Sequence, residues 1–167
     1  PELVPAWPRY LLFAQTVWIY FSAFQNRGGS GWWPKGSFSA LGSILSDPHY
    51  TLLPPGSVAP FYVFTQLGTL GTMLFESSAP LLILWTFFER SPNQPGRLPA
   101  LANRLRLRWV WIGVGVFFHL GIAVTLRLGI FPFGMLALYP SFVFPDELAR
   151  ARRAAARWVH GLRARAA

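Results

Sequence analysis

The chain has 167 residues and is 53% hydrophobic and 17% aromatic, while only 13% of it is charged. Soluble domains carry roughly 25% charged residues, so this composition favours a protein surface that is solvated by lipid. The absence of cysteine excludes disulfides, thiolate catalysis and cysteine-ligated metal centres.

The formal net charge of +9 is the other conspicuous bulk property. In a soluble protein it would indicate nucleic-acid binding. Here the basic residues, all arginine except Lys35, cluster between long apolar stretches. The charge therefore indicates membrane topology, and we expect no nucleic-acid partner.

Four apolar stretches, at 7–24, 58–88, 109–126 and 128–144, approach the roughly 17–25 residues that a membrane-spanning helix needs. With Arg9 on the inside, the connections alternate and twelve basic residues lie inside. The three on the outside are Arg27, Lys35 and Arg127. This asymmetry is what the positive-inside rule requires. The sequence thus predicts an all-α, multi-pass protein of a bacterial-type inner (cytoplasmic) membrane, with its C-terminus cytoplasmic.

The connection after the first stretch carries Trp32 and Trp33, side chains suited to the membrane–water boundary. Its glycine-rich run at 28–31 lacks the spacing of a phosphate-binding loop and is better explained as a turn. Apolar residues then recur at helical spacing over 37–46, which predicts a short helix lying in the outer interface.

The second stretch is longer than one crossing needs, and Pro80 is its expected bend point. Because proline lacks an N–H, it would leave the carbonyl of Glu76 without its helical partner. Thr65, Gly68, Thr72 and Glu76 share one side of this helix, a small and polar stripe suited to close helix packing.

Glu76 and His119 are the candidate catalytic residues, because each lies near the middle of an apolar stretch. Ionisable groups inside hydrocarbon are costly and face the bundle interior with a partner. We expect the two side chains to approach within hydrogen-bond range. They would either handle protons or bind a headgroup, or they would form a structural bond that locks two helices together. No set of metal ligands is predicted.

Residues 146–167 form a second unit after the bundle of residues 1–145. Arg150, Arg153 and Arg157 lie on one face of the expected helix, and Trp158 lies on the apolar face. Such a basic amphipathic helix suits an anionic membrane surface, with a protein partner as the alternative. Arg127, at the outer end of the third stretch, would anchor at the interface or bind a lipid phosphate.

Three stretches carry a resemblance to a known family. They are Trp-Ile-Tyr-Phe-Ser-Ala at 18–23 with Trp-Pro-Lys-Gly at 33–36, then Glu76 with Pro80, and finally Phe-Phe-His-Leu at 117–120 with Leu-Gly-Ile-Phe-Pro-Phe-Gly-Met at 128–135. Together they resemble the HTTM domain, the membrane domain related to vitamin K-dependent gamma-carboxylase.

The resemblance implies the later helices of a helical membrane bundle. In the carboxylase branch it also implies a site that oxidises reduced vitamin K to drive glutamate carboxylation. That branch has a lysine base after its Tyr-Phe helix, whereas this chain has Gln-Asn-Arg at 25–27. Arg27 cannot replace the base because a guanidinium stays protonated.

We therefore expect a non-catalytic accessory subunit of a larger membrane complex or a lipid-binding bundle, in contact with membrane lipids and other membrane proteins. The alternative is a carboxylase-like enzyme acting with a quinone or another lipid. The residues expected to touch lipid or partners are Trp32, Trp33, Arg127, Arg150, Arg153, Arg157 and Trp158.

Overall fold

A computed structural model describes residues 5–91 and 93–166, and side chains up to residue 158. This part of the chain is helical and holds no β-strand, as predicted for an all-α protein. Its helices are α1 (Trp7–Gln25), α2 (Ala40–Ser46), α3 (Tyr62–Ser77), α4 (Leu81–Arg90), α5 (Arg97–Leu105), α6 (Leu107–Thr125), α7 (Phe131–Leu138) and α8 (Pro145–Ala166).

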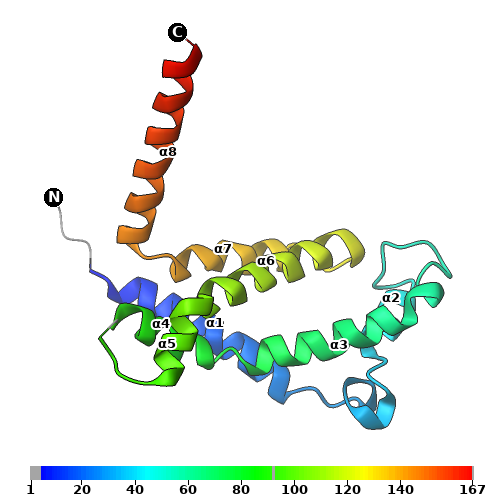
Figure 1. Cartoon of the computed structure of the whole chain (residues 1–167). Helices are drawn as coiled ribbons and strands as arrows, with labels where there is room; N and C mark the ends of the chain where they lie inside the picture. The colour runs from blue at the N-terminus through cyan, green and yellow to red at the C-terminus, as the bar shows by residue number, and fades with distance from the viewer. Residues whose placement is uncertain (1–4, 92, 167) are drawn as a thin grey trace.

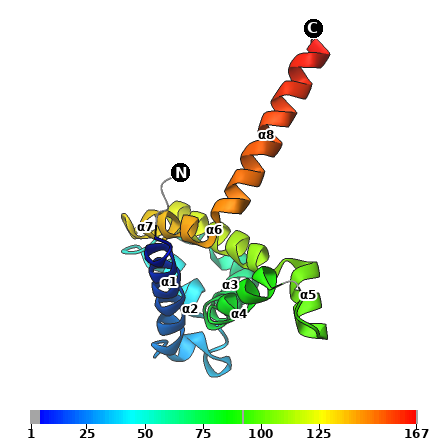
Figure 2. The ribbon, with the colours of Figure 1, turned by 90° about the vertical axis from the view of Figure 1, so that its left-hand side faces the viewer.

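The long helices α1, α3 and α6 build the bundle, with α7 folded back along α6 (Figure 1). Seen from the end of the bundle, α1 lies on one side and the short α5 on the other (Figure 2). The short helix predicted over 37–46 is present as α2 from Ala40 to Ser46 and packs on α3, while its place at a membrane interface stays a prediction. Gly42 and Gly68 permit this packing, because a Cβ there would lie 2.9 Å from the Thr65 hydroxyl and 2.6 Å from Leu41, respectively.

A bend of 59° separates α3 from α4, and Pro80 lies directly before α4, as predicted. The prediction that the Glu76 carbonyl is left free is wrong, because the Ala79 N–H donates to it at 3.2 Å in a tightened turn. The displaced acceptor is the carbonyl of Phe75. It accepts from the Ser78 hydroxyl at 2.8 Å and from Trp111 Nε1 at 3.3 Å.

An aromatic stack fills the centre of the bundle. Trp111 of α6 stacks on Phe75 of α3 with ring centroids 4.4 Å apart, and the Tyr139 ring lies nearly parallel to that of Trp111, with centroids 6.4 Å apart. A buried indole needs a partner for its N–H. Trp111 Nε1 donates to the Phe75 carbonyl and the Ser78 hydroxyl at the bend, and these hydrogen bonds help fix α6 against α3. The stack thereby sets the distance between the two helices that carry His119 and Glu76.

One end of the bundle is closed by a buried arginine, Arg108, whose side chain is 1% exposed. It donates to Glu89 at 2.6 Å, to the Phe142 carbonyl at 2.7 Å and to both carboxylate oxygens of Glu147. Glu147 also accepts from the N–H of Phe144 at the start of α8. These groups, the Arg108 cluster, tie α4, α6 and α8 together.

The connections at the opposite end pair with one another. The backbone N–H of Leu52 donates to Thr125 at 2.8 Å, and that of Arg127 donates to Tyr50 at 2.7 Å, around a β-bridge of Thr51 and Leu126. The charge pattern predicts that residues 27–60 and Arg127 lie on one side. The structure places these two connections together and the Arg108 cluster at the far end of α6.

Among the described residues, α6 is long and apolar enough to cross a membrane, and the bent pair Ala59–Ser77 with Leu81–Arg90 passes the same test together. The first predicted stretch is helical as α1. The fourth forms only the eight residues of α7 followed by a 3-10 turn at Tyr139–Phe142. Insertion into a membrane and the presence of four membrane-spanning segments stay predictions.

The predicted C-terminal helix is present as α8, which projects away from the bundle in both views and runs crosswise to α6 in Figure 1. Arg150, Arg153, Arg157 and Trp158 are all exposed. Arg150 pairs with Asp146 one turn earlier at 3.0 Å, and Asp146 also accepts from Arg90 at 2.9 Å. The beginning of α8 is thus held by ion pairs while its length stays free of the bundle.

Candidate functional site

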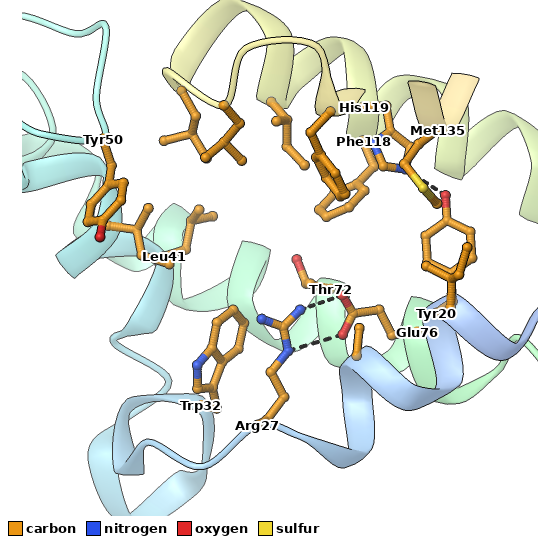
Figure 3. A pocket seen from close by; sticks show the side chains of 17 residues that line it. Tyr20, Arg27, Trp32, Leu41, Tyr50, Thr72, Glu76, Phe118, His119 and Met135 are labelled. Carbon is orange, nitrogen blue, oxygen red and sulfur yellow. Dashed lines mark hydrogen bonds and ion pairs between the residues drawn. The ribbon is translucent and has the colours of Figure 1, made fainter. Parts of the chain in front are cut away.

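Arg27 and Glu76 form an ion pair on the wall of a cavity (Figure 3). Arg27 follows the end of α1, and its Nε donates to Glu76 Oε2 at 3.2 Å while its Nη2 donates to Oε1. The ring of Trp32 lies 3.7 Å from the guanidinium carbon. The carboxylate is 5% exposed, so the fork of two bonds gives it the paired charge that a buried ion requires.

A chain of three hydrogen-bonding side chains crosses the bundle beside this pair. The Tyr20 hydroxyl of α1 lies 2.5 Å from His119 Nε2 of α6 and 2.7 Å from the hydroxyl of Tyr139. Tyr139 reaches Tyr20 past Gly115, where a Cβ would lie 1.8 Å from the Tyr139 hydroxyl oxygen. The chain therefore depends on a glycine one turn before His119.

Counting donors assigns the protons in this chain. If Tyr139 donates to Tyr20 and Tyr20 donates to His119 Nε2, every hydroxyl proton has an acceptor, and the remaining proton of a neutral ring is on Nδ1. The reverse order would leave the Tyr139 proton and Nδ1 both without partners. In either order His119 Nδ1 has no hydrogen-bond partner within the part of the chain that the structure describes, and this nitrogen is itself buried.

The cavity joins the two polar groups within a largely apolar space of about 600 Å³. Both His119 and the Arg27–Glu76 pair line it, and Figure 3 shows them on facing walls. The apolar lining comes from every layer of the bundle: Ile19, Ala23, Leu41, Ile44, Phe118, Ile122, Leu126, Leu128, Phe131 and Met135. The volume lies within the range of about 300–1,000 Å³ for small-molecule sites, and apolar walls with few polar groups are their usual lining.

Glu76 and His119, the candidate catalytic residues, therefore meet at one cavity, but the prediction of a direct hydrogen bond is wrong. Glu76 instead accepts hydrogen bonds from Arg27, and His119 is hydrogen-bonded to Tyr20. The tightened turn before Pro80 and the stack around Trp111 hold the two backbones so that an empty space separates the side chains.

Sequence reasoning missed Arg27, Tyr20 and Tyr139. The sequence predicted Arg27 in the outer connection, away from Glu76. In the structure α1 ends at Gln25 close to the C-terminal part of α3, which brings Arg27 to Glu76. A signal existed in both cases. A buried carboxylate needs a cation, and Arg27 directly follows the first apolar stretch of the sequence. Tyrosines inside apolar stretches likewise need partners for their hydroxyls.

The residues expected to touch lipid or partners divide into two groups. Trp32 is part of the cavity wall, while Trp33 is exposed and donates to the Arg27 carbonyl at 3.2 Å. Arg127 is exposed beside the connection at 48–58, and the arginines of α8 are exposed along that helix. No group of three metal-binding side chains occurs among the side chains described, those of residues 5–91 and 93–158.

Comparison with protein-family models, with curated proteins and with solved structures gave no match. The resemblance to the HTTM domain thus stays a prediction, and the function has to be argued from the site itself.

Proposed function

We propose that this protein is an integral membrane protein that binds an amphipathic, lipid-soluble molecule in the cavity between α1, α3, α6 and α7. The observation that carries the proposal is the cavity: about 600 Å³ of mostly apolar space, with an ion pair and the side chain of His119 on its walls. Apolar walls bind a hydrocarbon body, and the few polar groups orient its head.

The outer surface supports a lipid environment. Large apolar side chains point outward on every long helix, among them Trp18 on α1, Phe64 on α3 and Phe117 on α6, with exposed fractions of 65%, 69% and 79%. A water-soluble monomer does not carry apolar surface on this scale. Two further features agree with a lipid environment. The helix α6 and the bent pair α3–α4 are long and apolar enough to cross a membrane, and the predicted topology divides the basic residues twelve to three.

The same surface supports the role of an accessory subunit, because apolar helix faces also pack against other membrane proteins. A second candidate is an enzyme that acts on a bound quinone or another lipid. The specific observation in its favour is the Tyr139–Tyr20–His119 chain, which could pass a proton to or from a ligand in the cavity.

Binding is tested with the purified protein in lipid nanodiscs and a decyl-substituted benzoquinone, which quenches tryptophan fluorescence. We expect saturable quenching above that caused by partition into the lipid, because Trp32 lines the cavity. His119→Leu should weaken binding about tenfold by removing a polar side chain from the cavity wall and its hydrogen bond to Tyr20, while His49→Ala, in an exposed loop, should leave binding unchanged. Quenching that never saturates would refute the proposed ligand site.

Membrane topology is tested by labelling with an impermeant maleimide, which is clean because the chain has no cysteine. Lys35→Cys should react from the outside of intact cells. Gln94→Cys and Ala154→Cys should react only after the membrane is opened. Labelling of all three from one side, or release of the protein by alkaline carbonate, would contradict the multi-pass proposal.

A further inference from the structure

A groove of about 400 Å³ lies between α1 and α4, at the end of the bundle from which α8 projects (Figure 1). It is separate from the cavity, with which it shares no lining residue. On the α4 side four residues at helical spacing share the face that lines it: Ile83, Thr86, Phe87 and Arg90. The Thr86 hydroxyl donates to the Leu82 carbonyl of its own helix at 2.7 Å, so this wall is apolar up to the arginine.

The walls of the groove belong to the outer surface of the bundle. Tyr10 on α1 and Ile83 and Phe87 on α4 are all exposed. Phe13 and Ala14 complete the wall on the α1 side. In a lipid environment such a surface meets hydrocarbon chains, so the groove offers a place where one chain can lie along the bundle.

Two arginines gather around one aromatic ring at the end of the groove. The guanidinium carbon of Arg9 lies 4.3 Å from the centroid of the Phe144 ring, and that of Arg90 lies 4.5 Å from the same centroid. Arg9 belongs to the first turn of α1 and Arg90 to the last turn of α4. A guanidinium that stacks on a ring keeps N–H groups at its edge for an anion. The two helices therefore bring positive charge to one place beside an apolar groove.

This positive charge is only partly neutralised by the protein. Among the described residues Arg9 has no carboxylate partner, and Arg90 pairs with Asp146, which also pairs with Arg150. The side chains of Arg90 and Asp146 are 46% and 42% exposed, so their ion pair contributes little stability and leaves the guanidinium accessible.

The other carboxylates at this end of the bundle are engaged elsewhere. Glu89 and Glu147 both accept from Arg108. With Arg108 included, four arginines meet three carboxylates among the described residues of this region, and the excess is one positive charge. A ligand that carries a net negative charge would balance it.

Aromatic side chains indicate the depth of this end in a membrane. Trp7 and Tyr10 at the start of α1 and Trp109 near the start of α6 are exposed. Tryptophan and tyrosine concentrate at the boundary between hydrocarbon and headgroups. The topology predicted from the basic residues places the same end on the inside, where the leaflet carries anionic lipids.

We infer that the groove between α1 and α4 is a site for one anionic phospholipid of the inner leaflet. The phosphate binds Arg9 and Arg90 beside the Phe144 ring, and an acyl chain lies in the groove along Phe13 and Ile83. A choline head would add a positive charge where one is already in excess, so the site prefers a head such as phosphoglycerol. This assignment rests on the membrane placement in the proposed function and is independent of the ligand in the cavity.

Native mass spectrometry of the full-length protein, released from a neutral detergent, counts the lipids that bind. The probes are dioleoyl phosphatidylglycerol and dioleoyl phosphatidylcholine, which differ only in the head. We expect one saturable site for phosphatidylglycerol, with an affinity about fivefold or more above that for phosphatidylcholine. Glycerol phosphate, which has the head without the chains, should not compete at the same concentration, because the groove contributes to binding.

Substitutions then separate the head from the chain. Arg9→Gln and Arg90→Gln should each lower the affinity for phosphatidylglycerol about fivefold, the contribution of one arginine beside an anionic lipid. The matched control is Arg153→Gln, which removes the same charge from an exposed position on α8 outside the groove. Ala14→Phe should lower the affinity by filling the groove, whereas Leu12→Phe, on α1 outside the groove, should leave it unchanged. The unfolding temperature without lipid reports that each variant folds.

The contrary outcomes are distinct. Equal affinities for the two lipids, or equal losses in Arg9→Gln and Arg153→Gln, would overturn the site, because a diffuse charge effect would then explain the binding. Competition by glycerol phosphate would overturn the role of the groove and assign the arginines to a free phosphate. His119→Leu should not alter phosphatidylglycerol binding, so failure of the cavity ligand would leave this site standing. Release of the protein by alkaline carbonate would refute both proposals.

Discussion

The Arg108 cluster and the cavity both bury charged groups, but they use them differently. Arg108 donates through Nε and both terminal nitrogens, and its partners are two carboxylates and a backbone carbonyl that close one end of the bundle. In the cavity, Arg27 and Glu76 satisfy each other beside about 600 Å³ of space, and Nδ1 of His119 has no partner among the described residues. A closed network stabilises the fold, whereas a network with a vacant position next to a cavity can recognise a ligand.

The largest effect is expected for Arg108→Leu. It would leave the partly buried carboxylates of Glu89 and Glu147 without their cation, at a cost of about 3 kcal/mol in the free energy of unfolding. Thermal unfolding in detergent measures it. The control is Arg104→Leu, an exposed arginine on α5. A folded Arg108→Leu variant with unchanged stability would show that the Arg108 cluster does not stabilise the fold.

The next effect is expected for Gly115→Ala, which targets the contact between the stack and the cavity. The added methyl group would overlap the Tyr139 hydroxyl at 1.8 Å and crowd Phe75 at 2.8 Å. Overpacking of this kind costs about 1–3 kcal/mol in the free energy of unfolding, because Tyr139 and Phe75 must shift, and thermal unfolding in detergent measures it. Gly113→Ala, with nothing within 4 Å of its Cβ, should be neutral or slightly stabilising. Equal behaviour of the two variants would contradict the close approach.

These residues also show what the sequence could predict. The bend at Pro80 and the helix α2 follow from local chemistry and periodicity, and both are present. Burial of Glu76 and His119 follows from the cost of ionisable groups in apolar stretches. Their partners depend on where α1 ends against α3 and on the aromatic stack that spaces α3 from α6. Helical periodicity gives the face of a residue but not the depth at which two helices meet.

A smaller effect on stability and a sharper one on specificity are expected for Glu76→Gln. Loss of the bonds from Arg27 should cost about 1–2 kcal/mol, a value reduced because the Arg27 side chain is 21% exposed. The cavity would then carry an unpaired positive charge, and the variant should prefer a decyl carboxylate over the uncharged quinone. Combining it with Arg27→Gln should restore the original preference. Unchanged specificity in Glu76→Gln would mean that the ligand head does not approach the ion pair.

The smallest effect is expected for Tyr139→Phe, which keeps the ring in the stack and removes only the hydroxyl. Loss of one hydrogen bond should cost about 0.5–1.5 kcal/mol, because the Tyr20 hydroxyl keeps His119 as its partner. The Tyr20 hydroxyl still bonds to His119 Nε2, so the histidine keeps its place on the cavity wall and quinone binding should change less than threefold. His119→Leu, which removes this polar side chain, should lose about tenfold. Tyr10→Phe, an exposed tyrosine on α1, is the control and should change neither property. If Tyr139→Phe abolished binding while leaving stability intact, the ligand would require the Tyr139 hydroxyl rather than the His119 ring.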